Sequence, residues 1–210
     1  MDVYYIPTVF FTLFFVVDPL GLIPVFLLYL AGYRDHRRKR IIIRSIGISI
    51  AVSVFFILLG KYLLRFLGIS SGSFLVAGGI LLFIIAMEML LGQSSRVRMR
   101  DVGDPEQPEE ERDVSVFPLA IPMLCGPGNI AALVMFSTQA DGDIIKLAVI
   151  VALSVTVFIM AMVVMFFSDR IGTVVGGTGI AIMQKLMGLI LSAMSVQFIR
   201  NGLFELGIFR

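Results

Sequence analysis

Long apolar runs alternate with short polar segments along the whole chain. Six stretches each hold about 20 mainly apolar residues or more, the length that a helix needs to cross the hydrocarbon layer of a membrane. They cover residues 3–30, 41–60, 70–91, 115–138, 144–167 and 180–201. The runs are continuous rather than alternating with a period of two, so they predict helices and not the strands of a barrel. We therefore expect an all-α membrane protein with six transmembrane helices.

Composition removes the other broad classes. Apolar residues make up 58% of the 210 residues and charged residues only 15%, against about 25% charged in an average soluble domain. The net charge of +2 and the lack of a basic face argue against a nucleic-acid partner. The single cysteine, Cys125, excludes an internal disulfide framework and a cysteine zinc site. We expect no bound metal and no cofactor.

The distribution of Lys and Arg predicts the orientation in the membrane. With both termini outside, the inner connections hold eleven of these residues and the outer segments five, as the positive-inside rule requires. The chain opens MDVYY, without a basic leader region, so the first span is expected to be permanent. The segment 93–113 is highly charged and is interpreted as a cytoplasmic polar linker. It divides one transmembrane domain, 1–210, into the halves 1–92 and 114–210.

Each half repeats the same order of hydropathy. A helix with a Pro/Gly break comes first, then a plain helix, then a helix with a polar residue near its end. An offset of 109 residues aligns Gly79 with Gly188 and Glu88 with Gln197. Three spans is an odd number, so the second half inserts upside down relative to the first. The pattern predicts a 3+3 inverted-topology repeat, an architecture of many secondary transporters.

The first and fourth helices are predicted to be broken at mid-membrane. The breaks are Asp18-Pro19-Leu20-Gly21-Leu22-Ile23-Pro24 and Cys125-Gly126-Pro127-Gly128-Asn129. Proline removes a backbone donor and glycine weakens a helix, and unwound backbone at that depth is tolerated only inside protein or along a cavity. Asp18 and Gly126 are expected to start new half-helices, with Pro19 and Pro127 at the first helical position.

Two interpretations of the breaks stay open. Half-helix N-termini that meet at the midplane would favour a carboxylate, and Asp18 or unwound carbonyl groups would hold an ammonium group or a coupling cation, which together match a small zwitterion. Alternatively, Pro and Gly only kink the helices. The candidate substrate-binding residues are Asp18, Pro19, Leu20, Gly21, Pro24, Gly126, Pro127, Gly128 and Asn129.

Polar residues inside the predicted spans are candidates for coupling or gating. Asp18 lies deepest, and Glu88 and Lys185 lie near the cytoplasmic ends of the third and sixth spans, where they would form an ion pair or reach the interface. Gln197 is the counterpart of Glu88, or a residue that hydrogen-bonds between helices. Gly79, Gly188 and similar small residues are interpreted as close-packing positions.

Three long motifs resemble those of one known family. FFVVDPLGLIPVFL (14–27), FLVAGGILLFIIAMEMLLG (74–92) and FPLAIPMLCGPGNIAALV (117–134) are similar to blocks of the MarC family of integral membrane proteins, and the last span resembles that of the family too. Cys125 and Asn129 depart from the family pattern, which often has Ala and Thr there. The resemblance implies a multi-pass protein of the prokaryotic inner membrane, related in architecture to LysE-type exporters. Some members of the family are described as transporters of glycine and alanine.

The sequence therefore predicts a secondary transporter that moves a small neutral amino acid, such as glycine or alanine, by alternating access. A proton or sodium ion is the candidate coupling ion, with Asp18 or Glu88 as its carrier. The alternatives are a passive channel or exporter for another small solute or ion, and a membrane scaffold without transport activity. No paired catalytic constellation is present, so an enzyme is not expected. The lipid bilayer is the expected surrounding, and the oligomeric state is open.

Overall fold

The computed structural model of the chain describes residues 4–30, 33, 35–92 and 115–208. These residues form helices and turns, and none of them lies in a strand. The helices are α1 (Tyr5–Val17), α2 (Ile23–Leu30), α3 (Asp35–Phe66), α4 (Ser71–Leu90), η1 (Ser115–Leu124), α6 (Pro127–Ala140) and α7 (Ile144–Glu205). The predicted linker 93–113 lies outside the described residues. An all-helical fold is confirmed.

Several of these helices are apolar enough for a membrane. Within the described part of the chain, α3, α4 and α7 are each long and apolar enough to cross one, and η1 and α6 meet the same criterion as a bent pair. The helix α1 is apolar but shorter. The exact count of six spans in two inverted repeats stays a prediction.

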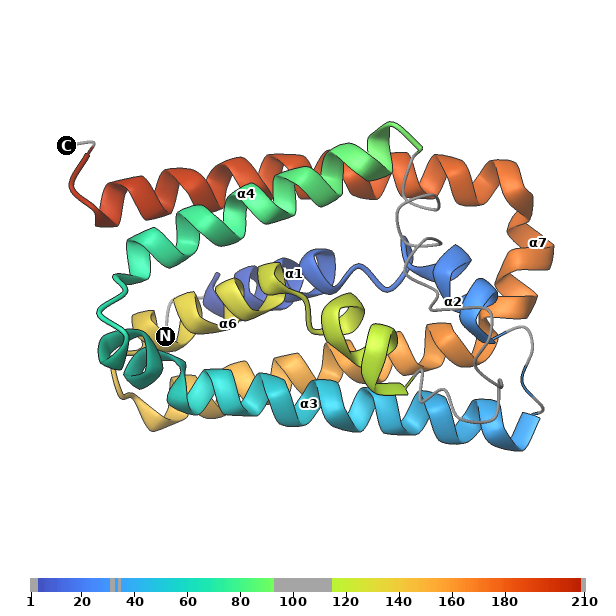
Figure 1. The fold of residues 1–210 in the computed structure, drawn as a ribbon, viewed down its shortest axis with the longest axis horizontal. Helices are drawn as coiled ribbons and strands as arrows, with labels where there is room; N and C mark the ends of the chain where they lie inside the picture. The colour runs from blue at the N-terminus through green and yellow to red at the C-terminus, as the bar shows by residue number, and fades with distance from the viewer. Residues whose placement is uncertain (1–3, 31–32, 34, 93–114, 209–210) are drawn as a thin grey trace, which may run out of the picture.

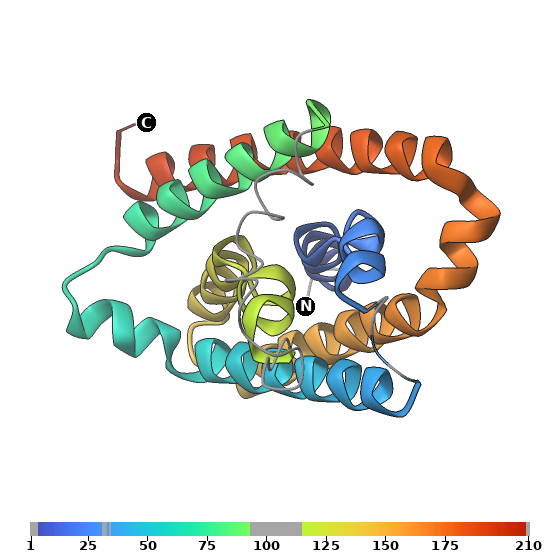
Figure 2. The same cartoon turned by 45° about the vertical axis from the view of Figure 1, so that its right-hand side comes forward.

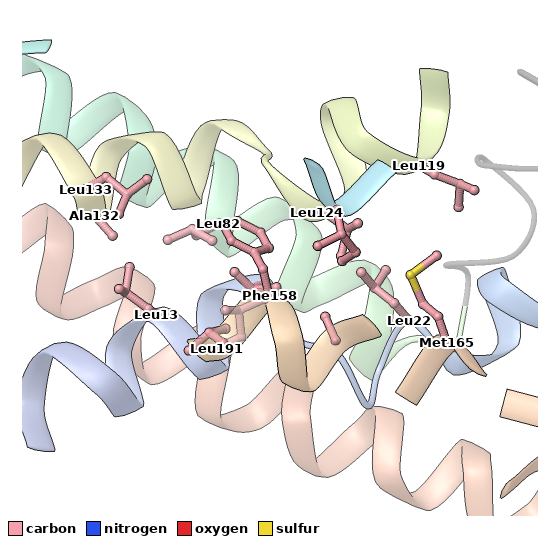
Figure 3. Close-up of a cluster of buried hydrophobic side chains, with 14 of the residues drawn as sticks. Leu13, Leu22, Leu82, Leu119, Leu124, Ala132, Leu133, Phe158, Met165 and Leu191 are labelled. Atoms are coloured by element: carbon pink, nitrogen blue, oxygen red, sulfur yellow. The ribbon is translucent and has the colours of Figure 1, made fainter. Parts of the chain in front are cut away.

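The helices lie in three layers (Figure 1). One outer layer holds α4 and the second arm of α7, and the other holds α3 and the first arm of α7. Between them lie α1 and α6, and α2 and η1 continue this middle layer to their right in Figure 1. Figure 2 shows these four helices enclosed by α3, α4 and α7. Figure 3 shows the hydrophobic core between the layers, where buried side chains from α1, α4, η1, α6 and α7 meet.

The last two predicted spans form one helix of 62 residues that reverses direction. The segment 168–179, which connects the last two predicted spans, is itself helical almost throughout. The helix turns at Gly176, whose φ of 66° and ψ of 170° lie in a region that is essentially restricted to glycine. Within α7, Gly176 is the described residue whose backbone angles are non-helical.

The second predicted span, 41–60, is also shorter than the helix found. The helix α3 runs from Asp35 to Phe66 and includes the basic residues before the apolar run. Lys and Arg are good helix formers, and no proline interrupts this stretch. Polarity marks where a span leaves the membrane but not where its helix ends.

One ion pair joins α3 to the first arm of α7, and another joins α3 to the turn between α6 and α7. Lys61 Nζ lies 3.0 Å from Asp141 Oδ1, just before α7 begins. Far along the same arm, Arg38 pairs with Asp169 and donates to Ser168 Oγ at 3.0 Å. The hydrogen bond and charge of Lys61 lower the pKa of the exposed Asp141 carboxyl group. The two helices are therefore linked as one layer.

The other layer depends on close backbone approach. A Cβ at Gly72 of α4 would lie 2.7 Å from the carbonyl oxygen of Gly202 in α7, and a Cβ at Gly202 would lie 2.6 Å from that of Gly72. Gly79 and Gly188 face the partner helix in the same way, as the sequence predicted. Such small residues let membrane helices pack by van der Waals contact, where no hydrophobic driving force operates.

Candidate functional site

Two interruptions separate helices, one within the first predicted span of each half of the chain. The helix α1 ends where Asp18 adopts a left-handed conformation, with φ of 49° and ψ of 60°, and α2 begins at Ile23 after a turn. Aspartate tolerates this conformation better than most residues, and the following proline disfavours the α region there. The interruption at Asp18 thus follows from local sequence.

The second interruption follows from prolines and a glycine. Phe117 and Ile121 each precede a proline and are extended, as the ring of a following proline favours. Gly126 is extended too and caps α6, which begins at Pro127. Its predicted role as the start of a helix is confirmed.

The two interruptions line one central cavity of about 260 Å³. Residues from α4 and from the second arm of α7 complete its wall. The described lining residues are Val16, Val17, Asp18, Gly21, Leu22, Tyr29, Leu82, Ile85, Glu88, Met89, Phe117, Pro122, Met123, Gly126, Pro127, Gly128, Asn129, Gln184 and Leu191. Segments more than 100 residues apart in the sequence thus form one site.

Asp18 organises the wall on the α1 side of the central cavity. Its side chain is 6% exposed, and its Oδ1 accepts a hydrogen bond of 3.0 Å from the Gly21 N–H. The contact resembles that of a capping side chain three residues ahead of its donor. Asp18 is the C-cap of α1, however, and α2 begins only at Ile23, so the prediction that Asp18 starts a half-helix with Pro19 at its first position was wrong. A Cβ at Gly21 would collide with the Asp18 carboxylate.

The opposite wall is formed by the first turn of α6. Its early N–H groups, including that of Gly128, have no acceptor within the helix, and the cap Gly126 has no side chain to supply one. A Cβ at Gly128 would collide with the Leu82 side chain of α4. Glycine at this position therefore lets Leu82 pack directly against the backbone of α6 at the cavity wall.

Asn129 is held by its neighbours in the same turn. Its Nδ2 lies 3.7 Å from Cys125 Sγ, and Ser53 Oγ of α3 lies 3.6 Å from the same sulfur. Asn129 is 2% exposed, and no described residue donates a hydrogen bond to its Oδ1. The central cavity therefore has an unsatisfied acceptor in its wall.

The predicted coupling candidates separate in space. Asp18 and Glu88 line the central cavity, whereas Lys185 is exposed and outside its lining. Glu88 and Lys185, both described, form no ion pair with each other. Gln197 lines a different cavity.

The second cavity, of about 390 Å³, is lined by uncharged polar and apolar side chains from α1, α6 and the second arm of α7. Its described lining residues are Thr8, Thr12, Met135, Phe136, Gln139, Met194, Gln197, Phe198 and Asn201. Gln197 Nε2 donates to Asn201 Oδ1 at 2.7 Å. On α1, Thr12 of this cavity and Val16 of the central cavity are four residues apart, about 6 Å along a helix.

Three predicted substrate residues lie outside the lining of the central cavity. Pro19 and Leu20 belong to the turn after α1, and Pro24 lies in the first turn of α2. They shape the backbone there. Their direct contact with a substrate stays a prediction.

Gln184 is the polar wall residue that sequence reasoning missed. Its Nε2 donates to the Gly21 carbonyl oxygen at 3.4 Å and so ties α7 to the first interruption. It stands beside Lys185 in an apolar run, and unlike Gln197 it has no ionisable counterpart in the other half, since it aligns with Leu75. Among the described residues, no group of three or more His, Cys, Asp or Glu is arranged to hold a metal ion.

Comparison with known proteins identifies the family. A membrane protein of Methanocaldococcus jannaschii, UPF0056 membrane protein MJ1677, is 33% identical over 97% of this chain and 98% of its own. UPF0056 membrane protein YvbG of Bacillus subtilis is 32% identical over 95% of this chain and 94% of its own. No solved structure gives a significant match. The model of the MarC family of integral membrane proteins matches residues 3–206, so the chain belongs to this family of multi-pass membrane proteins.

Proposed function

We propose that the protein is a secondary transporter that moves a small neutral amino acid, of the size of glycine or alanine, by alternating access. The observation that carries the proposal is the central cavity, where the two interruptions meet. Non-helical backbone inside a membrane protein is tolerated where it lines a cavity, and such backbone forms the substrate site in several transporter folds.

The size of the central cavity favours a small solute. Pockets for drug-sized ligands measure about 300 to 1,000 Å³, and this cavity measures about 260 Å³. Apolar side chains such as Leu82 and Leu191 form much of the wall. A small solute with a short or absent side chain suits these dimensions.

The polar groups of the central cavity match a zwitterion. The first-turn N–H groups of α6 and the positive end of its dipole favour a carboxylate. Asp18 and Glu88 bring negative charge to the same wall, and none of the described lining residues is Lys, Arg or His. A solute that carries both a carboxylate and an ammonium group would complement both features.

Alternating access is supported by the second cavity. Buried Leu13 and Leu133 lie between the residues of the two cavities along α1 and α6. A thin apolar barrier of this kind is what a carrier would open and close. We propose that it closes one side of the central cavity in the conformation described.

We further propose the 3+3 inverted repeat and both mid-membrane breaks. In this scheme α1–α2 corresponds to η1–α6, α3 to the first arm of α7, and α4 to its second arm. Corresponding elements are neighbours in the three layers (Figure 2). Glu88 and Gln197, equivalent by sequence, line different cavities near opposite ends of the paired helices α4 and α7, as inversion requires. With both termini outside, Glu88 is then on the cytoplasmic side of a cell membrane.

Uptake into proteoliposomes tests the function. The purified full chain is reconstituted, and entry of labelled glycine and alanine is measured with imposed proton or sodium gradients and with unlabelled competitors. Saturable uptake that excess glycine or alanine inhibits is the expected result, and the effective gradient identifies the coupling ion. No uptake by vesicles that contain folded protein would contradict the proposal.

Counterflow separates the carrier from the alternative, a passive channel. In vesicles preloaded with unlabelled glycine, a carrier drives transient accumulation of labelled glycine. Each site that carries unlabelled glycine out of the vesicle returns with labelled glycine bound. A channel gives neither saturation nor counterflow. Two half-helices that meet at mid-membrane would also suit a channel, and the barrier between the two cavities is the observation that favours the carrier.

A further inference from the structure

The side-chain amide of Asn129 is a buried polar group of the central cavity whose hydrogen bonding within the described residues is incomplete. It lies in the first turn of α6 with 2% exposure. Its Oδ1 receives no hydrogen bond from any described residue. Buried acceptors are normally paired, so a group of this kind indicates a partner that the protein does not itself supply.

The surroundings of Asn129 leave its oxygen rather than its nitrogen for that partner. Nδ2 lies 3.7 Å from Cys125 Sγ, and the sulfur is contacted from the other side by Ser53 Oγ at 3.6 Å. This short chain of contacts links the amide to α3 and engages one of its two N–H donors, whereas its Oδ1 has no partner among the described residues. The amide oxygen is an acceptor only and requires a hydrogen-bond donor.

The charges around Asn129 specify the kind of donor. The same cavity holds the carboxylates of Asp18 and Glu88, and no Lys, Arg or His is among its described lining residues. Lys185 of α7, the predicted ion-pair partner of Glu88, is exposed and makes no ion pair with it. A donor that also carries positive charge fits this set of acceptors, and an ammonium group has three such N–H donors.

We propose that Asn129 determines specificity by accepting a hydrogen bond from the ammonium group of the solute, so that the central cavity selects cationic nitrogens that carry N–H. This proposal rests on the proposed function and deepens it, because it assigns the residue that recognises the ammonium group of the solute. Sites that hydrogen-bond a substrate N–H reject analogues without it, because the buried acceptor is then left unpaired. Cys125 is a positioning residue that orients the amide.

The test compares solutes that differ in N–H count in two proteins. Uptake of labelled glycine by the full chain in proteoliposomes is measured with unlabelled glycine, N-methylglycine or glycine betaine as the competitor. Glycine betaine carries no N–H. We expect glycine to inhibit the unaltered protein at least about tenfold more strongly than betaine does. In Asn129→Leu this preference should shrink towards unity. Exclusion of betaine by size alone would leave the ratio unchanged, which would overturn the proposal.

Asn129→Asp is the matched variant, because it keeps the shape and an acceptor oxygen. It should retain glycine inhibition within a few-fold of the unaltered protein and preserve the rejection of betaine. If the amide nitrogen reads the substrate carboxylate instead, the new charge would abolish glycine binding, and the proposal would be wrong.

Thermal unfolding gives a readout that does not need transport. Asn129→Leu removes an unsatisfied buried acceptor, so without ligand its melting temperature should equal or exceed that of the unaltered protein. Glycine and methylammonium should raise the melting temperature of the unaltered protein but not that of Asn129→Leu. Tetramethylammonium should raise neither.

The same measurement separates the two proposals. Stabilisation by methylammonium but not by glycine, together with no glycine uptake, would refute the amino-acid substrate and keep the role of Asn129. Glycine uptake with equal effects of methylammonium and tetramethylammonium would keep the transporter and refute the role of Asn129.

Discussion

Asp18 combines a structural and a chemical role in one side chain. Its Oδ1 caps the turn through the Gly21 N–H, and its carboxylate lines the central cavity. The cap requires only an oxygen, whereas binding of a coupling cation requires the charge. The two roles are therefore separable by an isosteric change.

Asp18→Asn should keep the fold and lose ion coupling. We expect gradient-driven accumulation of glycine to fall by about tenfold or more, since a hydrogen bond to a charged group contributes about 1.5–3 kcal/mol, while exchange without a gradient persists. Proteoliposome uptake with and without imposed proton and sodium gradients measures both. Asp35→Asn, at the exposed start of α3, is the control. Unchanged gradient dependence would mean that Asp18 is not the coupling residue.

Gly128 is required because Leu82 packs directly over it. Gly128→Val should destabilise the protein by about 1–3 kcal/mol through overpacking and abolish glycine uptake by filling the cavity wall. The double variant Gly128→Val/Leu82→Ala makes room for the valine side chain and should therefore regain part of the lost stability and part of the glycine uptake. Gly47→Val is the control, because no atom lies within 4 Å of a Cβ at Gly47. Normal uptake by Gly128→Val would refute a site at α6.

At the scale of elements, α7 shows how one residue changes the course of a helix. Gly176 has φ of 66°, and a Cβ there would meet nothing within 4 Å, so its requirement for glycine is purely one of backbone conformation. The neighbouring Gly177 has equally open space and an ordinary φ. A comparison of substitutions at Gly176 and Gly177 therefore separates the effect of backbone conformation from the effect of side-chain packing.

Gly176→Ala should lower the free energy of unfolding by about 1–3 kcal/mol, because it forces a side chain into a glycine-only region. Gly177→Ala should leave stability unchanged or raise it slightly, because alanine is the better helix former. Thermal unfolding in detergent measures both variants. Equal effects would show that the turn of α7 does not depend on the conformation of Gly176.

At the scale of the whole molecule, the ion pairs at both ends suggest that α3 and the first arm of α7 move together. Lys61 and Asp141 close one end of this layer, and Arg38 and Asp169 close the other. If this layer is a rigid unit in the transport cycle, movement takes place between layers. A covalent link between α3 and the first arm of α7 should then leave transport activity unchanged.

A cleavable bifunctional thiol crosslinker, which has a longer reach than a direct disulfide, should leave glycine uptake within about twofold when it joins Lys61→Cys to Asp141→Cys, because both positions belong to one rigid unit. The buried Cys125 is left in place. The same crosslinker between Thr12→Cys of α1 and Met194→Cys of α7, which both line the second cavity, should stop uptake until it is cleaved. Loss of uptake in the first pair would mean that α3 and α7 separate during transport.

The Lys61–Asp141 pair also predicts a response to acid. Lys61 lowers the pKa of Asp141 below its ordinary value of 3.8. A lowered carboxyl pKa stabilises the fold above the unfolded-state pKa, and this contribution is lost as the pH falls through the folded-state pKa. Between pH 5 and pH 3, Lys61→Met should therefore lose less stability than the unaltered protein does. Thermal unfolding across this range is the check, and parallel curves would contradict it.

Sequence alone determined the membrane class, the helical fold and the two interruptions. These properties are local. Apolar runs long enough to cross a membrane form helices in lipid. The prolines and glycines from Asp18 to Pro24 and from Phe117 to Pro127 interrupt those helices whatever their neighbours in the fold are. The tertiary structure decided which polar groups meet. Gln184 reaches Gly21 across 163 residues of sequence, and Glu88 and Gln197 face different cavities. These outcomes depend on the rotation and depth of each helix against its neighbours, which only packing sets and which no local pattern contains.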